Sequence, residues 1–175
     1  MSVPLLETPR LILRAHRIDD FADSAAMWAD PTVVQFISGT PSTEEQSWSR
    51  LLRYGGHWSF LGYGYWVVER KTDKAFLGEV GFADYHRDTT PRFDGKPEAG
   101  WVFKSEAHGQ GYATEAVTEM LRWADANLDW PSTACMVHPS NAVSIKVARK
   151  VGYSNEQRGQ YGDREAVFFE RPRAA

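Results

Sequence analysis

The chain has 175 residues, of which 42% are hydrophobic and 25% are charged, so it can build a core without disulfides or metal ions. Its formal net charge of -3 argues against nucleic-acid binding, which shows as an excess of basic residues. The single cysteine, Cys135, excludes an internal disulfide. The first residues contain no apolar run of signal-peptide length, and no segment approaches the roughly 20 apolar residues of a membrane span. We therefore expect a single cytoplasmic domain over residues 1–175 with no nucleic-acid or membrane partner.

The expected secondary structure mixes strands and helices in an irregular order. A first strand follows Pro9, and two helices follow it, the second of which starts at a capping box of Ser42 and Glu45 and stops at Gly55 and Gly56. Further strands are expected at residues 64–70, 75–85, 98–104, 133–138 and 164–170, and further helices at 111–127 and 141–152. Such an order predicts an α+β or α/β fold with a mixed sheet.

Two glycines, Gly109 and Gly111, stand between the strand at 98–104 and the helix at 111–127. Glycine lets the backbone approach a ligand closely, and the free N–H groups of a first helical turn favour an anion such as phosphate. A tight turn that binds nothing is the alternative. The dinucleotide fingerprint fails because Thr114 stands at its sixth position, and the Gly-Lys-Ser/Thr end of a P-loop is absent.

The helix at 141–152 carries two polar residues toward its apolar side. An ideal helix places Ser144 in the middle of the face formed by Val143, Val147, Ala148 and Val151, and Asn141 near the edge of that face. Polar groups that point inward need partners. Either Asn141 caps the helix and Ser144 bonds its own backbone, or both face a ligand beside the glycine turn.

Residues 109–116 read G-Q-G-Y-A-T-E-A, and in their strand–turn–helix setting they resemble the coenzyme A-binding motif of the GCN5-related N-acetyltransferases (GNAT). More narrowly, they resemble the RimJ/RimL-like branch, which acetylates ribosomal-protein N-termini. The resemblance extends from TPRLILR near the start to the GY after the last expected helix. It implies a three-layer α/β arrangement: a mixed, mostly antiparallel sheet of six to seven strands with helices on both faces. It also implies that the fourth and fifth strands splay around coenzyme A. One departure is Glu106, where the family often has Gln or Arg.

The resemblance implies a set of residues that bind acetyl-CoA, with backbone N–H groups near the end of the fourth strand holding the thioester oxygen and Asn141 bonding the pantetheine arm. The set is Val102, Phe103, His108, Gly109, Gln110, Gly111, Tyr112, Ala113, Thr114, Asn141, Ser144 and Lys146. For Lys146, a solvated basic face is the alternative. The family's tyrosine that protonates the leaving thiolate corresponds to Ala148 here, so Ser144 is the nearest substitute.

The expected reaction is direct attack of a primary amine on the thioester, with acetyl-CoA as cosubstrate and no metal. The acceptor is a small amine or a protein N-terminus, and a homodimer is compatible with the sequence. Glu98 is preferred to Glu79 as the general base, because the family commonly has an acidic residue before the Gly-aromatic pair of that strand. Water acting alone is a further alternative. A non-catalytic acyl-CoA sensor is the rival hypothesis, since the family tyrosine is missing.

Other reactive residues are expected to be structural. Cys135 is interpreted as a core thiol, because His138 lies three residues further along the same strand and faces the other way. The five histidines show no metal-ligand spacing, and a surface position is favoured for His86. The aromatic residues of one region are expected mostly in the core, with some walling the acceptor pocket; they are Trp28, Phe36, Trp48, Trp58, Tyr65 and Trp66.

Overall fold

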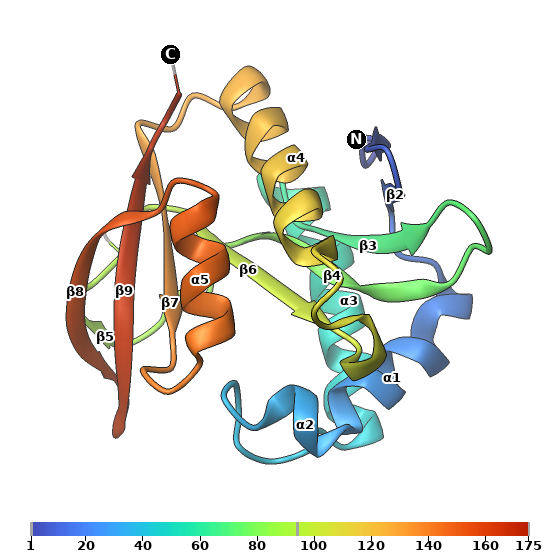
Figure 1. The fold of residues 1–175 in the computed structure, drawn as a ribbon, viewed down its shortest axis with the longest axis horizontal. Helices are drawn as coiled ribbons and strands as arrows, with labels where there is room; N and C mark the ends of the chain where they lie inside the picture. The colour runs from blue at the N-terminus through green and yellow to red at the C-terminus, as the bar shows by residue number, and fades with distance from the viewer. Residues whose placement is uncertain (1, 94, 175) are drawn as a thin grey trace.

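The structure, a computed structural model, describes residues 2–93 and 95–174. One sheet runs in the order β1-β2-β3-β4-β6-β7-β9-β8-β5 (Figure 1). Its strands are β1 (Leu6–Glu7), β2 (Leu11–Arg14), β3 (Tyr65–Arg70), β4 (Phe76–Ala83), β5 (Thr89–Thr90), β6 (Glu98–Phe103), β7 (Ser132–Val137), β8 (Ser154–Tyr161) and β9 (Arg164–Pro172). The helices are α1 (Phe21–Ala29), α2 (Pro31–Val34), α3 (Glu44–Leu61), α4 (Tyr112–Asn127) and α5 (Ala142–Lys150), with 3-10 turns η1 (Ile18–Asp20) and η2 (Ser105–Ala107). The predicted fold class is confirmed.

The sheet has nine strands, more than the six to seven expected. Two of the additional strands, β1 and β5, are only two residues long. The third, β8, reads SNEQRGQY and is exposed or half-exposed along its whole length. Backbone hydrogen bonds to β9 hold it in the sheet, and these leave no hydrophobic pattern in the sequence. Its polar side chains suit a strand near the edge of a sheet.

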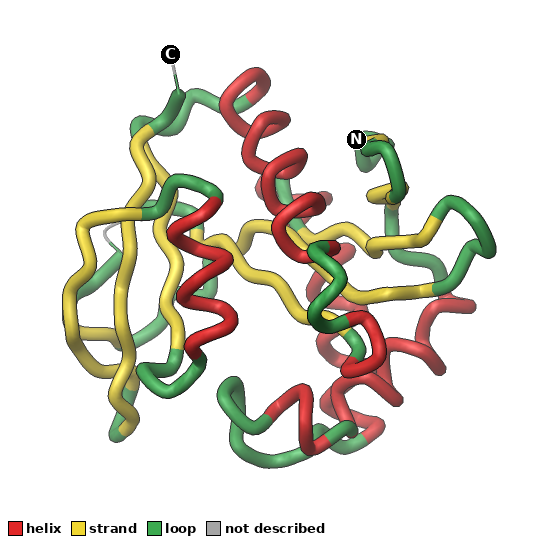
Figure 2. Tube along the Cα trace, viewed as in Figure 1, coloured by secondary structure: helices red, strands yellow, loops and turns green. Residues whose placement is uncertain are grey.

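The strands β6 and β7 separate in the middle of the sheet. β6 pairs with β4 along its full length, from Glu98 to Phe103. Its parallel pairing with β7 is confined to Glu98 and Ala134. Figures 1 and 2 show the two strands running apart, with α4 and α5 in front of the gap. The expected splay of the fourth and fifth predicted strands is therefore confirmed.

Helices cover both faces of the sheet. The α4 side holds the larger core, in which Phe82 and Phe103 pack with Met120. The α1 side holds a smaller cluster that includes Trp28 and Val102. Because side chains alternate along a strand, Glu98, Gly100 and Val102 face α1 and α3, whereas Ala99, Trp101 and Phe103 face α4. Within the described part of the chain, no helix combines the length and the apolarity that crossing a membrane requires.

Helix α3 begins and ends at different residues from those predicted. Its capping box joins Thr43 and Gln46, one residue beyond the predicted Ser42 and Glu45. The helix continues through the predicted stop and ends at Gly62, whose φ of 75° is left-handed. Its buried side chains, which include Leu51, Tyr54 and Trp58, anchor it to the sheet. This packing outweighs the low helix propensity of the two glycines inside it.

Replacing Gly55 and Gly56 by alanine is expected to stabilise the protein. A Cβ atom at either position would meet nothing within 4 Å. Alanine favours a helix interior over glycine by about 1 kcal/mol per residue, so each substitution should raise the free energy of unfolding by up to that amount. Urea unfolding measures the effect. Gly64→Ala is the control and should destabilise, because its Cβ would lie 2.7 Å from the Trp58 ring. A lower midpoint for the double variant would contradict the prediction.

Candidate functional site

A cavity of about 470 Å³ opens where β6 and β7 separate. The predicted residues Glu98, Val102, Asn141 and Ser144 all contribute to its lining, although the first two come from β6 and the last two from the start of α5. Three of the aromatic side chains considered as walls of an acceptor pocket also contribute; they are Trp28, Phe36 and Tyr65. Tyr54, which was not among them, contributes as well. The cavity thus extends from the first turn of α5 to α3, on the opposite face of the sheet.

Glu98 is a buried carboxylate on the α3 side of this cavity, with 11% of its side chain exposed. Arg87, in the loop after β4, donates from Nε to its Oε2 at 2.7 Å. Burial raises the pKa of Glu98 above its ordinary value of 4.5, and the charge of Arg87 offsets only part of that rise. A carboxylate with a raised pKa, placed in a cavity, is suited to accept a proton near neutral pH.

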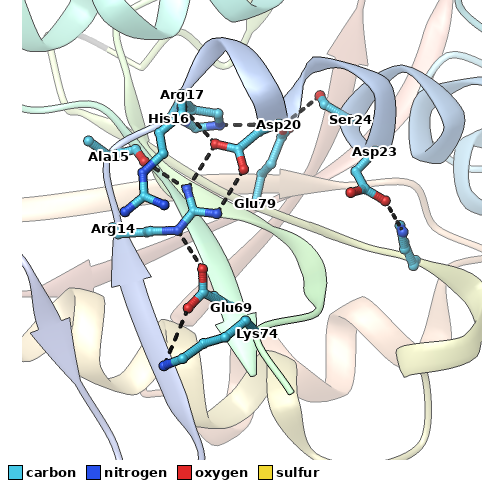
Figure 3. A network of polar contacts seen from close by, with 11 residues as sticks. Arg14, Ala15, His16, Arg17, Asp20, Asp23, Ser24, Glu69, Lys74 and Glu79 are labelled. Carbon is cyan, nitrogen blue, oxygen red and sulfur yellow. Dashed lines mark hydrogen bonds and ion pairs between the residues drawn. The ribbon is translucent and has the colours of Figure 1, made fainter. Parts of the chain in front are cut away.

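Glu79, the other predicted candidate for the base, is fully buried and does not line the cavity. Its carboxylate accepts hydrogen bonds from Ser24 Oγ at 2.7 Å, Trp28 Nε1 at 3.0 Å and Tyr54 OH at 3.1 Å. His16 Nε2 lies 3.4 Å from Oε1, and Figure 3 shows His16, from the segment between β2 and η1, and Ser24, from α1, beside Glu79. Burial alone would raise the pKa of Glu79, but these partners lower it overall. Glu79 therefore ties α1 and α3 to β4.

On the edge of β6 that faces β7, the backbone N–H groups beyond the Glu98–Ala134 pair have no strand partner within residues 2–93 and 95–174. Lys104 N donates to Leu77 O on β4 at 2.9 Å. Because N–H groups alternate in direction along an antiparallel strand, that of Val102 also points to β4. The N–H groups of Trp101 and Phe103 point to the gap instead. Of the two predicted residues, Phe103 thus offers a backbone donor to the gap, while Val102 contributes its side chain to the smaller core cluster.

The glycine turn leads from β6 into α4, which packs against α5. Gly109 and Gly111 have φ angles of 73° and 80°, a left-handed conformation that glycine adopts without strain. Among the residues that the structure describes, no side chain caps the first N–H groups of α4, whose N-cap is Gly111. His108 Nε2 lies 3.0 Å from Phe103 O, and Gln110 Nε2 donates to Glu106 O at 2.7 Å. The side chains of His108 and Gln110 therefore stabilise the turn, and its backbone remains open to a ligand.

The remaining predicted residues of this segment lie in the first turn of α4. Tyr112 is buried in the larger core, whereas Ala113 and Thr114 are half-buried. Their side chains lie beyond the turn, so what this segment offers a ligand is its backbone N–H groups.

Arg10 supplies a cation at this turn that the sequence did not reveal. Its Nη1 donates to Gln110 O at 3.0 Å, and its Nε donates to Glu115 Oε2 at 2.7 Å. Its guanidinium lies over the Tyr112 ring, 4.5 Å from the centroid. A positive charge therefore lies beside Gly111. The family pattern often provides a positive charge at position 106, where this chain has Glu106. No spacing rule links residues a hundred positions apart.

Asn141 and Ser144 lie together at the start of α5. Asn141 Oδ1 accepts from Ser144 N at 3.0 Å, so Asn141 is the N-cap of the helix. Both side chains also line the cavity, so the cap and the ligand-facing position coexist. For the rest of the helix, the structure agrees with one expectation and contradicts another. Lys146 is exposed, as either of its interpretations requires, but Val143 is 70% exposed and does not belong to the buried face.

Substitutions of Asn141 should separate its two roles. Asn141→Ala removes both the cap and the carboxamide, so it should cost about 1 kcal/mol of stability and, if Asn141 binds coenzyme A as the family resemblance implies, weaken that binding. Asn141→Asp keeps a capping oxygen but loses the amide donor. We expect it to retain stability and to bind coenzyme A several-fold more weakly in calorimetry. If Asn141→Asp binds as tightly as the unchanged protein, then Asn141 is only a helix cap.

The side chains interpreted as structural have no nucleophile–base geometry. Cys135 is 1% exposed in the larger core, where burial raises the pKa of its thiol. His138, just after β7, instead lines the cavity, and its ring packs 5.5 Å from that of Phe36. His86 is exposed, as expected, with a φ of 47°.

Comparisons with known proteins agree with this geometry. The family described as "Acetyltransferase (GNAT) domain" matches residues 10–154. An uncharacterized N-acetyltransferase p20 from Bacillus licheniformis is 25% identical over 86% of this chain and 83% of its own length. The acetyltransferase from Agrobacterium tumefaciens strain C58 is 26% identical, with a TM-score of 0.83 over 97% of this chain and 95% of that one. RimL, a ribosomal L7/L12 alpha-N-protein acetyltransferase solved with coenzyme A, shares the fold at 13% identity, with a TM-score of 0.78 over 97% and 98% of the two chains.

Proposed function

The chain belongs to the GNAT acetyltransferases, and from this premise we propose that it transfers an acetyl group from acetyl-CoA to a primary amine by direct attack in a ternary complex. The acceptor is a small amine or a protein N-terminus. The observation that carries the proposal is Glu98, a buried carboxylate with a raised pKa that lines the cavity between the splayed strands.

The residues around the gap fit coenzyme A. The uncapped N–H groups of α4 and the guanidinium of Arg10 suit its pyrophosphate, and Gly109 leaves open space where a Cβ would stand. Asn141 and Ser144 offer polar groups to its pantetheine arm from inside the cavity. Lys146, exposed on α5, is proposed to reach an outer phosphate. RimL, which shares the fold, is described in complex with coenzyme A.

The chemical roles follow from what each residue offers. When bound, acetyl-CoA supplies the thioester whose acetyl group is transferred. Phe103 N–H, which points into the gap, polarises the thioester oxygen. Glu98 accepts the proton of the attacking amine on the α3 side, directly or through water. Ser144 stands on the opposite side of the cavity, where its hydroxyl can donate to the departing thiolate, in the role that Ala148 cannot fill.

Two observations bear on the class of acceptor. RimL is named for acting on the alpha-amino group of a ribosomal protein, which supports a protein N-terminus. The cavity size supports a small amine equally well.

A screen of amines tests the proposal. Acetyl-CoA is incubated with the protein and a set of small amines and short peptides with free N-termini, and release of free thiol is followed. We expect release that depends on one subset of amines. Binding of acetyl-CoA, seen as a raised melting temperature, without thiol release for any amine would support the sensor hypothesis and overturn the enzyme hypothesis.

A further inference from the structure

Two arginines on one face of α3, Arg50 and Arg53, line the acceptor side of the cavity. Arg50 lies flat over the Trp28 ring, 3.7 Å from its centroid, and its Nη2 donates to Ser42 Oγ at 3.1 Å. Its Nη1 is buried without a hydrogen-bond partner in the described part of the chain. A guanidinium N–H that lacks an acceptor is unfavourable, so Arg50 retains hydrogen-bonding capacity that no described residue uses.

Neither arginine has a carboxylate to pair with. Among residues 2–93 and 95–174, no Asp or Glu oxygen lies within 4.0 Å of a side-chain nitrogen of Arg50 or Arg53. Arg53 lies over the Tyr85 ring instead, at 5.1 Å. Both cations are therefore held in place by aromatic rings, which orient them without neutralising their charge.

The other charged residues of the cavity do not cancel the positive charge of Arg50 and Arg53. Arg87 is paired with Glu98, and Arg164 donates to Ile37 O at 2.8 Å. Glu165 is the other acidic residue of the lining. The α3 side thus presents two unpaired guanidinium groups to anything that enters beside Glu98, a setting in which carboxylate or phosphate oxygens make strong, bidentate hydrogen bonds.

We propose that the acceptor amine carries an anionic group, a carboxylate or a phosphate, which Arg50 and Arg53 bind while the amine nitrogen faces Glu98. This inference rests on the proposed function and narrows its substrate class. The two cations bind and orient the acceptor and take no part in the bond changes. Arginine recognises the geometry of carboxylates and phosphates alike, so the chemistry of the anion is left to the measurement.

Matched pairs of acceptors test the proposal. β-Alanine is compared with β-alaninamide, O-phosphoethanolamine with ethanolamine, and the amidated peptide Ser-Glu-Gly with Ser-Gln-Gly. For at least one pair, we expect kcat/KM of the anionic member to exceed that of the neutral one at least tenfold, which corresponds to roughly 1.4 kcal/mol. The pair with the largest ratio identifies the anion and separates a small acceptor from a peptide.

Substitutions attribute the preference to the two arginines. Arg50→Gln and Arg53→Gln should each lower the anionic-to-neutral ratio of kcat/KM, chiefly by raising KM for the anionic member. Arg158→Gln, on the exposed strand β8 outside the cavity, is the matched control and should keep the full ratio. Arg53 is exposed, so its variant should fold even if loss of the Arg50–Trp28 contact destabilises the other.

Binding to the protein loaded with free coenzyme A gives a readout that needs no turnover. The anionic member of a pair should bind at least tenfold more tightly in calorimetry, and Arg53→Gln should remove the difference. Equal binding of both members in all three pairs, or a preference that survives both substitutions, overturns the inference. Absence of thiol release with every amine overturns the proposed function instead, and the binding comparison still decides the preference.

Discussion

Gly111→Val is expected to abolish detectable binding of acetyl-CoA. Gly111 is the N-cap of α4 at a φ of 80°, and it turns the chain so that the first N–H groups of the helix face outward. Valine is strained in this conformation, so it either tilts the turn or places its branched side chain in front of the N–H groups. Loss of a hydrogen bond to a charged phosphate costs about 1.5–3 kcal/mol, or roughly a tenfold to hundredfold loss of affinity for each bond, so the loss of several bonds takes binding below detection. Isothermal titration calorimetry measures this change.

Backbone strain alone would also lower stability, so the variant needs a control that shares it. Gly162, in the turn between β8 and β9, has a φ of 59°, and a Cβ there would meet nothing within 4 Å. Gly162→Val should lower the melting temperature in a similar way but bind acetyl-CoA normally. If Gly111→Val folds and binds as tightly as this control, the turn does not hold the phosphates.

The sequence predicted those parts of the fold that leave a periodic or local pattern. The apolar stripe of α4 and the glycines at its start are visible in the sequence, and both lie where predicted. β8 was missed because its pairing depends on backbone groups and its side chains are polar. The predicted α3 is too short because Gly55 and Gly56 weaken a helix locally. In the structure, packing of its buried face on the sheet stabilises the helix through these two residues.

The candidate site likewise has parts that the sequence predicts and parts that only the structure reveals. Glu98 and Glu79 are indistinguishable as glutamates within apolar strands, and only the structure shows one lining a cavity and the other bonded to Ser24, Trp28 and Tyr54. Arg10 and Arg50 act through contacts between distant segments, which no local pattern encodes. The sequence therefore locates the glycine turn well, but it does not reveal the contacts between distant segments that form the rest of the candidate site.

Glu98→Gln is expected to lower kcat by about 100-fold at neutral pH, the usual size of a general-base contribution, and to leave acetyl-CoA affinity unchanged. Glutamine keeps the shape of the side chain and a hydrogen-bond acceptor for Arg87, but it cannot take a proton. Most amines are protonated at neutral pH, so the variant depends on the small fraction of free amine. Its rate should therefore recover partly as the pH rises toward the pKa of the acceptor.

The pH dependence of activity in the unchanged enzyme should show the direction in which the pKa of Glu98 is shifted. Glu98 acts as a base only when ionised, and burial raises its pKa above 4.5, so activity should fall on acidification at a higher pH than an exposed glutamate would give. That acidic limb should be missing in Glu98→Gln. Glu79→Gln is the matched control: it places an amide donor among the donors Trp28 and Tyr54, so it should lower stability by about 1–3 kcal/mol and retain the acidic limb. If Glu98→Gln turns over at the wild-type rate across this pH range, then water alone takes the proton, because Glu79 does not reach the cavity.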